Sequence, residues 1–576
     1  MSRLRAFFPF LAWASSYNRE TFMGDMVAAI IVAIMLIPQS LAYAMLAGLP
    51  AEVGLYASIF PLIAYALLGT SSTLSVGPVA ITSLMTAAAL AEVAQQGSAG
   101  YLEAAITLAA LSGLILFAFG ILRLGFLANF LSHSVVSAFI TASAIIIALS
   151  QARHLLGIDG GGDTVAELLS SLSANYSSTN VYTLLIGAGV LWFLYIVRIK
   201  GTGWLDRLGF SRHNAHLIIK AAPVMSVFVT IIAVILFGLD QYGVAIVGEI
   251  PRGLPAPTLP GFSPELVRAL LLPAVLISII GYVESISVGR TLGTRRQERV
   301  NSNQELVGLG AANLASAFSG AFPVTGGFSR SVVNFDAGAI TQAASIYTAF
   351  LIGLVSVFLT PFLYYLPKAT LAATIMVAVL SLVDLSIIRK TWRFSKSDWL
   401  AIIITISLTL LYGVEVGVSS GVLVSLGMHL YRTSRPHVAE VGQVEGTEHF
   451  RNIRRYKVQT VPEILTLRID ESLFFANTNY LEELIYDQVY HHDAIAHVVL
   501  MCAAVNEIDF SALEALLQLN QRLQEQGIQL HLSEVKGPVL DKLRSSHFLD
   551  QLSGKVYLSQ FQAFSELSAR YGYSGG

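Results

Sequence analysis

The sequence predicts an all-α membrane body followed by a small α/β domain that lies in water. Charged residues make up 12% of the 576 residues, about half their share in soluble proteins. From about Met26 to Met428 the sequence is a series of apolar blocks, and after about Arg432 it resembles soluble protein. From about Tyr456 strand-like and helix-like patterns alternate, as in an α/β domain. The expected parts are a cytoplasmic N-terminal segment (1–20), a transmembrane domain (21–432), a linker (433–455) and a soluble domain (456–576).

Charge and cysteine content exclude several classes of function. The net charge is -2, so nothing indicates a nucleic acid as a partner. The single cysteine, Cys502, lies in the soluble part, which excludes a disulfide framework and a Cys/His metal cluster. No phosphate-binding loop, nucleophile–base set or metal-ligand spacing is present, so we expect neither an enzyme nor a cofactor.

The apolar blocks predict full membrane spans and two half-spans. A spanning helix needs roughly 20 apolar residues. Two shorter apolar pieces, near 79–93 and 329–338, are expected to be half-spans. The candidate full spans lie near 26–46, 52–69, 102–121, 126–150, 181–199, 218–238, 264–288, 302–321, 340–366, 368–383, 399–413 and 415–431.

Lysine and arginine in the short loops predict the orientation, because cytoplasmic loops carry an excess of both. With the N-terminus inside, the external loops hold little more than Arg153, Arg252, Arg268 and Lys368. The cytoplasmic loops then hold Arg123, Arg198, Lys200, Arg207, Arg212, Lys220, Arg290, Arg295, Arg296, Arg299, Arg389, Lys390, Arg393 and Lys396. Counting both half-spans as crossings gives fourteen segments. We therefore expect a multi-pass protein of the cell (inner) membrane with both termini in the cytoplasm.

The membrane sequence is interrupted at corresponding places in its two halves. The polar, glycine- and proline-containing runs Gly69–Pro78 and Gly320–Ser331 each lead into a short apolar piece. Such backbone survives at membrane depth only when it is buried in protein or lines a cavity. Paired interruptions indicate a transporter built from inverted repeats, in which two half-helix N-termini favour an anion. Arg330 adds a full positive charge there; the alternative is two surface loops on an ordinary bundle.

Polar side chains also lie inside apolar spans. Gln39 follows a proline, and taken alone this indicates a kink with the amide bonded to a neighbouring helix. Glu284 follows more than two turns of apolar sequence, where a carboxylate is costly and marks function by default. Burial favours its protonated form, so proton or cation coupling is one hypothesis and a permanent ion pair with Arg330 is the other. Asp25 lies near a span end and is expected at the interface.

These stretches resemble the SulP family of inorganic anion permeases. The first match runs from Ile37 to Pro61, IPQSLAYAMLAGLPAEVGLYASIFP, and continues through Gly69–Pro78. The second half matches through Asn303–Gly310, NQELVGLG, and Gly326–Ser331, GGFSRS. The resemblance covers nearly the whole chain. It implies fourteen segments in two seven-segment inverted repeats, a gate and a core subdomain, two half-helices and a homodimer.

The resemblance also implies site residues. The positions that match the substrate site of the family are Gln39, Tyr43, Val79, Ala80, Phe328, Ser329 and Arg330. The first two match site-lining positions of the first segment, the next four begin the third and tenth segments, and Arg330 matches a basic residue of many relatives. Glu284 matches an acid of proton-coupled plant and microbial members, which favours symport over exchange.

The soluble part resembles the STAS domain that SulP proteins share with bacterial anti-sigma factor antagonists. The expected strands are Glu463–Ile469, His497–Met501 and Ile528–Leu532, and the expected helices are Tyr480–Tyr490 and Ser511–Gln526. In the antagonists a phosphorylatable serine follows the aspartate that Asp509 matches, but here Phe510 occupies that place. Ser511 begins the pattern of a capping box with Glu514 and is expected to be a structural N-cap rather than a phosphosite. We expect the domain to serve assembly or regulation, with a cytoplasmic protein as a candidate partner.

The leading functional hypothesis is a secondary carrier that moves a small inorganic or carboxylate anion, such as sulfate or bicarbonate, by alternating access. Coupling to a proton or sodium is expected at Glu284. The alternatives are an uncoupled anion exchanger or channel, then a nucleobase carrier of similar architecture, then a membrane-anchored sensor with the STAS domain as output. The expected partners are the anion, a co-transported proton or sodium, the lipid bilayer and a second copy of the chain; no metal is expected.

Overall fold

A computed structural model describes residues 8–129, 133–162, 164–207, 209, 219 and 221–572. Arg212 and Lys220, which entered the orientation argument, lie outside the described residues, as do parts of the expected spans 126–150 and 218–238. The chain divides into two compact units, Met1–Ser425 and Leu426–Gly576. Each unit is described by itself.

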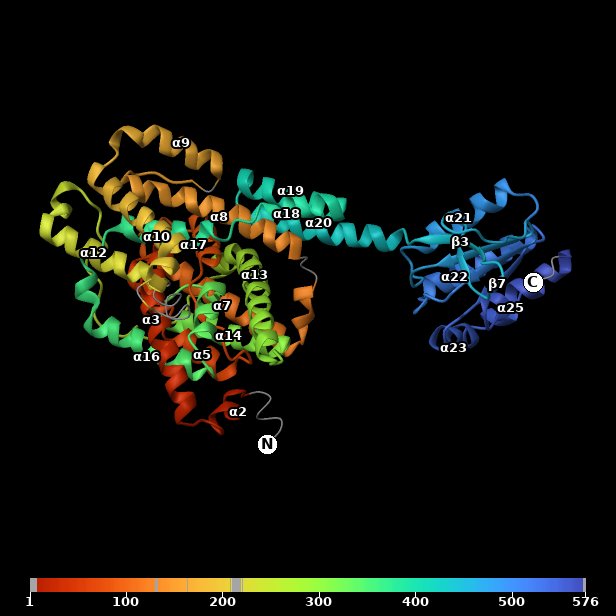
Figure 1. Ribbon diagram of the computed structural model, residues 1–576, viewed down its shortest axis with the longest axis horizontal. Coiled ribbons are helices and arrows are strands. Elements are labelled where there is room, and N and C mark those ends of the chain that lie inside the picture. Colours follow the sequence, from red (N-terminus) through yellow and green to blue (C-terminus); the bar gives the residue numbers. More distant parts are fainter. Residues whose placement is uncertain are drawn as a thin grey trace. The chain divides into compact units, whose positions relative to one another are not determined.

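The first unit is a helical bundle (Figure 1). Its principal helices are α3 (Arg19–Leu46), α4 (Ala51–Tyr56), α5 (Phe60–Leu68), α6 (Ala80–Ala91), α7 (Ala99–Ile121), α8 (His133–Leu156), α9 (Val165–Asn175), α10 (Val181–Arg207), α12 (Ala222–Phe237), α13 (Pro264–Arg296), α14 (Ser302–Phe318), α15 (Phe328–Asp336), α16 (Ala343–Phe358), α17 (Lys368–Leu380), α18 (Ser386–Phe394), α19 (Lys396–Tyr412) and α20 (Val414–Ser434), which continues into the second unit. Among the described helices, six are long and apolar enough to span a membrane, counting α4 and α5 together, and α6, α12, α16 and α17 are shorter apolar helices.

The helices pack in two groups. In one group α14 packs on α5 and α7, α13 on α7, and α16 on α3; in the other α8 packs on α17 and α19, and α10 on α17. Gly310 of α14 meets α7 at backbone distance, because a Cβ there would lie only 2.7 Å from the Phe117 amide nitrogen. Small residues at such crossings let helices approach closely where no water drives them together. The expected gate and core subdomains correspond to these two groups.

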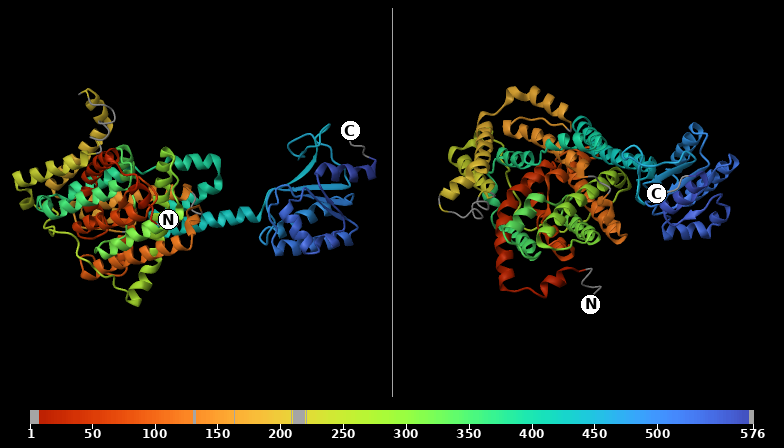
Figure 2. Two further views of the ribbon diagram at one scale, coloured as in Figure 1. Left: turned by 90° about the horizontal axis from the view of Figure 1, so that it is seen from below. Right: turned by 45° about the vertical axis from the view of Figure 1, so that its right-hand side comes forward.

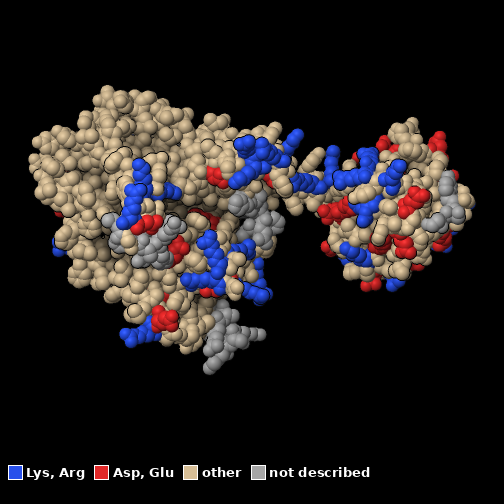
Figure 3. All heavy atoms as spheres, viewed as in Figure 1, with Lys and Arg blue, Asp and Glu red and all other residues tan. Residues whose placement is uncertain are grey.

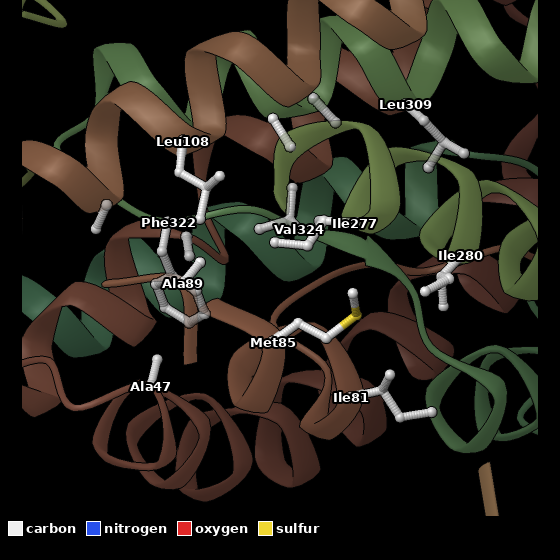
Figure 4. Packing of buried hydrophobic residues seen from close by; sticks show 14 of the residues in the cluster. Ala47, Ile81, Met85, Ala89, Leu108, Ile277, Ile280, Leu309, Phe322 and Val324 are labelled. Atoms are coloured by element: carbon white, nitrogen blue, oxygen red, sulfur yellow. The ribbon is translucent and has the colours of Figure 1, made fainter. Parts of the chain in front are cut away.

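Both expected half-helices are present. α6 begins at Ala80 and α15 at Phe328, each one residue away from the start expected from the sequence. α6 is held by a large apolar cluster, in which Ile81, Met85 and Ala89 pack among side chains of α7, α13 and the segment before α15 (Figure 4). This burial fixes a helix that is too short to span a membrane by itself.

The second unit is a six-stranded sheet with helices on both faces (Figures 1 and 2). The strand order is β4-β3-β5-β6-β7-β8, in which β5 to β8 run parallel and β3 is antiparallel to both neighbours. The strands are β3 (Val438–Gln443), β4 (Phe450–Asn452), β5 (Ile464–Ile469), β6 (His497–Met501), β7 (Gln529–Ser533) and β8 (Val556–Tyr557). The helices are α21 (Thr478–His491), α22 (Phe510–Glu525), α23 (Gly537–Ser545), α24 (Phe548–Gln551) and α25 (Gln560–Ser568).

Alternate residues of β6 face different layers, as the two-residue period of a strand requires. Val498 and Leu500 pack in a cluster with α21, α22 and α23, whereas Val499 packs in a second cluster with α25. The three expected strands and two expected helices match β5, β6, β7, α21 and α22 within two residues. However, the expected linker 433–455 contains β3 and the short edge strand β4. Both strands precede the alternating pattern that begins near Tyr456, so that pattern did not indicate them.

The expected N-cap at Ser511 is wrong. Helix α22 begins at Phe510, and Asp509 is the N-cap, whose Oδ1 accepts a hydrogen bond from the Ala512 amide at 2.8 Å. Its Oδ2 also accepts from the Phe475 amide at 2.9 Å. The second bond comes from a distant segment and draws the helix start two residues upstream, which a local capping pattern cannot indicate.

A buried histidine pair predicts a pH dependence for the second unit. His497 Nδ1 and His531 Nε2 lie 3.1 Å apart, and the Lys555 amide donates to His531 Nδ1. Burial, with a smaller contribution from His497, lowers the pKa of His531 to about 4; burial and Arg570 lower the pKa of His497. Both histidines have a lower pKa in the folded protein than the ordinary value of the unfolded chain. Their contribution to the stability of the unit is therefore complete above about pH 6.5 and is lost as the pH falls toward 4.

We expect the second unit to lose about 2 kcal/mol of unfolding free energy between pH 7 and pH 5 through His531. The measurement is the urea midpoint at which Cys502, the only cysteine and buried in this unit, reacts with 4,4′-dithiodipyridine in the full-length protein. His531→Gln is expected to flatten the dependence, and His491→Gln, at an exposed position, to leave it intact. Equal slopes for all three proteins contradict the assignment.

Candidate functional site

Two dipeptide strands join the halves of the first unit. β1 (Val76–Gly77) pairs antiparallel with β2 (Thr325–Gly326), with Val76 opposite Gly326. Helix α6 begins three residues after β1 ends and α15 begins two residues after β2 ends, so the pairing brings their N-termini together. Neither N-cap residue, Val79 or Gly327, supplies a side-chain cap. The first amide groups of both helices are therefore available to a ligand, and both helix dipoles favour an anion.

The strand pair is held rigidly by hydrogen bonds from neighbouring helices. Asn313 bonds both backbone groups of Val324, each at 2.9 Å. The Ser285 hydroxyl accepts from the Gly326 amide at 2.9 Å and donates to the Gly281 carbonyl at 2.6 Å. These side chains lie on α14 and α13, so two long helices fix the place where α15 starts.

Arg330 lies in the first turn of α15 and is buried, with 2% of its surface exposed. Its Nη2 donates to the Thr325 carbonyl at 3.3 Å, whereas the buried Nη1 has no hydrogen-bond partner. The guanidinium lies against the backbone of Gly77 and Gly327, since a Cβ on either would come within 2.8 Å of it. A side chain at either position would displace the guanidinium from this place, and the arginine retains unused donors beside two helix N-termini.

A cavity of about 590 Å³ brings the expected site residues together. The half-helix starts form one wall, and α3, α10, α12, α13 and α17 contribute the others. No side-chain hydrogen bond is recorded for Gln39 or Tyr43 within the described chain, so neither amide nor hydroxyl is committed to a neighbouring helix. All of the expected residues line this cavity, namely Gln39, Tyr43, Val79, Ala80, Glu284, Phe328, Ser329 and Arg330. That they bind or couple stays a prediction.

Glu284 lies on α13 between two different environments. It lines the large cavity, and it also lines a small apolar pocket with Phe139, Val135 and Ile280. Its Oε2 is buried and has no hydrogen-bond partner. The structure records no ion pair between Glu284 and Arg330 within 4.0 Å, although both line the same cavity. The contact that a permanent ion pair between Glu284 and Arg330 requires is therefore not present.

Two further carboxylates, Glu305 and Asp25, hold the chain beside the half-helices, a role that the sequence alone did not indicate. Glu305 is fully buried at the start of α14 and accepts from the Tyr65 hydroxyl at 2.7 Å, from the amide and hydroxyl of Thr70, and from the Ser71 amide. Asp25 accepts from the Ile340 amide at 2.6 Å and from Thr341. Asp25 is completely buried in the protein, and its expected position near the membrane interface stays a prediction. The feature of the sequence that could have indicated Glu305 is the cluster of polar residues inside an apolar span.

Comparison with protein families decides the classification. The model of the sulfate permease family matches residues 22–405, and that of the STAS domain matches residues 455–563. The chain belongs to the sulfate permease family. The sulfate permease fold and its STAS domain, both expected from the sequence, are confirmed. Because the family comprises membrane permeases, the assignment as a permease rather than an enzyme is confirmed as well.

Relatives of known name resemble this family member over most of its length. It is 36% identical to Sulfate transporter 4.1, chloroplastic, of Arabidopsis thaliana, over 91% of this chain and 77% of the relative. It is 33% identical to Sulfate transporter 1.3 of the same plant, over 99% of this chain and 88% of the relative. These matches include both the helical body and the STAS domain.

Solved structures share the fold of this permease. The murine Solute Carrier 26 family member A9 anion transporter superposes with a TM-score of 0.90 at 24% identity, covering 99% of this chain and 95% of that chain. The transmembrane domain of a cyanobacterium bicarbonate transporter, BicA, superposes with a TM-score of 0.60 at 23% identity, covering 71% of this chain and 99% of that chain.

Proposed function

We propose that this permease is a secondary carrier of a small inorganic anion, with sulfate as the first substrate to test and bicarbonate as the second. One observation carries the proposal: two uncapped half-helix N-termini and the unused donors of Arg330 face one cavity. Backbone amides, helix dipoles and a guanidinium favour the same sign of charge. Sulfate comes first because the plant relatives are named sulfate transporters.

Gln39 and Tyr43 complete the proposed binding site from the first long helix. Their uncommitted amide and hydroxyl can donate to anion oxygens opposite the backbone groups of Ala80 and Ser329. In the proposed orientation, with both termini cytoplasmic, the cavity continues along Arg198 of α10 and Ser381 after α17 toward the inner side of the membrane. Alternating access then requires the group of α8, α10, α17 and α19 to move against the group that holds the half-helices.

Uptake of radiolabelled sulfate and bicarbonate by proteoliposomes tests the proposal. We expect saturable uptake of one of these anions and competition by other small oxyanions. Uracil and xanthine are expected not to compete, which separates an anion carrier from a nucleobase carrier. Absence of uptake or exchange for every anion tested contradicts the proposal and favours a membrane-anchored sensor.

We further propose that Glu284 couples transport to a proton or to sodium. Its buried oxygen has no partner and faces the same cavity as Arg330, so binding a cation there offsets an uncompensated charge. An inward gradient of one pH unit means a proton concentration about tenfold higher outside, and this difference drives proton entry. We expect the proton or the sodium gradient to raise initial uptake and Glu284→Gln to abolish that response.

The control for coupling is Glu92→Gln, which removes an exposed carboxylate at the far end of α6. It is expected to respond to the gradients as the unmodified protein does. A Glu284→Gln protein with the normal gradient response contradicts coupling at this residue. An unmodified protein that responds to neither gradient supports the alternative, an uncoupled exchanger or channel.

A further inference from the structure

A short amphipathic helix separates two apolar helices of the first unit. α18 follows α17, and α19 begins two residues after α18 ends. Asp384 starts α18 by accepting from the Ser386 amide at 2.9 Å and from its hydroxyl at 2.6 Å. No residue of the helix is buried. At 100° per residue, its basic side chains gather on one side and its apolar side chains on the other.

The basic side of α18 and the first residue of α19 carry exposed positive charge. Arg389, Lys390, Arg393 and Lys396 are all exposed, and no ion pair is recorded for any of them in the described chain. Figure 3 shows lysine and arginine gathered where Figure 1 places α18 and α19. Four basic residues beside a membrane helix are typical of sites that attract anionic lipids.

The apolar side of α18 borders an open groove of about 380 Å³. It is lined by Leu385, Ile388, Trp392 and Trp399 together with Arg389. The two tryptophan rings meet edge to face, with centroids 4.6 Å apart. Trp392 remains 53% exposed. Tryptophan prefers the boundary between headgroups and acyl chains, so this groove suits a lipid that lies at that depth.

We infer that α18 and Trp399 form a binding site for an anionic phospholipid. The headgroup phosphate is held by Arg389 and its basic neighbours, and an acyl chain lies in the groove against Trp392. Charge complementarity selects this occupant, because a zwitterionic lipid leaves the basic side uncompensated. In the proposed orientation α18 faces the cytoplasmic leaflet, where anionic lipids are concentrated.

The site adjoins the transport cavity along the chain. Ser381 and Leu382, which line the cavity, are followed within four residues by the first residue of α18. A lipid bound to α18 therefore anchors the inner end of α17 at a fixed depth in the membrane. Since α17 belongs to the group that must move against the half-helices, lipid composition becomes a determinant of transport rate.

Quenching by brominated lipids tests the site in the full-length protein. Trp13, Trp192 and Trp204 are replaced by phenylalanine, which leaves Trp392 and Trp399 as the reporters. The protein is reconstituted in phosphatidylcholine vesicles with equal small fractions of brominated phosphatidylglycerol or brominated phosphatidylcholine. We expect brominated phosphatidylglycerol to be preferred by about fivefold or more, since each basic group near an anionic surface contributes about that factor.

Matched variants separate the site from a general effect of charge. Arg389→Gln/Lys390→Gln/Arg393→Gln is expected to reduce the preference to about one. The control, Arg454→Gln/Arg455→Gln/Lys457→Gln, removes three exposed charges of the second unit and is expected to retain it. Arg389→Lys/Arg393→Lys, which keeps the charge, is also expected to retain it, so a loss in the triple glutamine variant reflects charge rather than misfolding.

Three outcomes overturn the inference. The first is equal quenching by the two lipids in the starting protein, and the second is an unchanged preference in the triple glutamine variant. The third is a preference abolished by excess inorganic phosphate but not by chloride at equal ionic strength, which identifies a site for free phosphate instead. Retention of the preference in phosphate supports the lipid.

Discussion

Replacing Arg330 by glutamine is expected to reduce anion uptake by about 10- to 100-fold, through a higher KM. A hydrogen bond to a charged group contributes about 1.5–3 kcal/mol, and each 1.4 kcal/mol corresponds to a factor of ten in affinity. Arg330 is the basic side chain at the junction of the two half-helices, and its Nη1 has no protein partner. Glutamine keeps a donor for the Thr325 carbonyl but removes the positive charge.

Two further variants make the Arg330 result specific. Arg330→Lys keeps the charge but loses the planar fork, so we expect an intermediate KM. Arg290→Gln removes an exposed arginine that donates to the Ser302 hydroxyl at 2.7 Å outside the cavity, and we expect its uptake to equal that of the unmodified protein. Initial rates over a range of anion concentrations measure all three. If Arg330→Gln and Arg290→Gln have the same KM, Arg330 does not contribute to binding.

The sequence predicted the half-helices well because their signal is local. Gly69–Pro78 and Gly320–Ser331 contain polar, helix-breaking residues beside apolar pieces, and α6 and α15 start within one residue of the expected positions. The pairing of β1 with β2 could not be predicted from pattern. Each strand has only two residues, and they are separated by more than two hundred positions, so no periodicity or turn chemistry links them.

The resemblance to the SulP family predicted the residues that line the cavity, but it did not predict the contacts that hold them in place. Gln39, Tyr43 and Arg330 lie in recognisable stretches, but the unused donors of Arg330 become apparent only once Gly77 and Gly327 pack against the guanidinium. Ser511 shows the converse. Its local sequence has a good capping pattern, but Asp509 is the N-cap instead. The hydrogen bond that Asp509 accepts from the Phe475 amide comes from a distant segment, which a local pattern does not contain.

Asp25 and Glu305 perform equivalent tasks in the two halves. Glu305 holds the backbone of Thr70 and Ser71, which leads to α6, and Asp25 holds the backbone of Ile340 and Thr341, which follows α15. Each carboxylate reaches across from a helix of the other half. The segment before α6 and the segment after α15 are therefore each held by a buried acid, and neither acid lines the cavity.

Replacing Glu305 by alanine is expected to destabilise the first unit by about 3–5 kcal/mol, because it leaves several buried donors without an acceptor. We expect the midpoint of thermal unfolding in detergent to fall by ~10 °C. The matched control is Glu298→Gln. Glu298 bonds the same loop through the Ser72 hydroxyl at 2.6 Å but is exposed, and its replacement is expected to cost less than about 0.5 kcal/mol.

Glu305→Gln separates positioning from stability. Glutamine keeps one oxygen for the donors of Thr70 and Ser71, and its NH2 group can donate to the Tyr65 oxygen, so most of the protein folds. The neutral amide holds the loop less tightly than a carboxylate does, and α6 starts only nine residues beyond Ser71. We expect a raised KM for the anion with little change in kcat. A normal KM in a folded Glu305→Gln protein limits Glu305 to a structural role. Equal midpoints for Glu305→Ala and Glu298→Gln contradict the expected loss of stability.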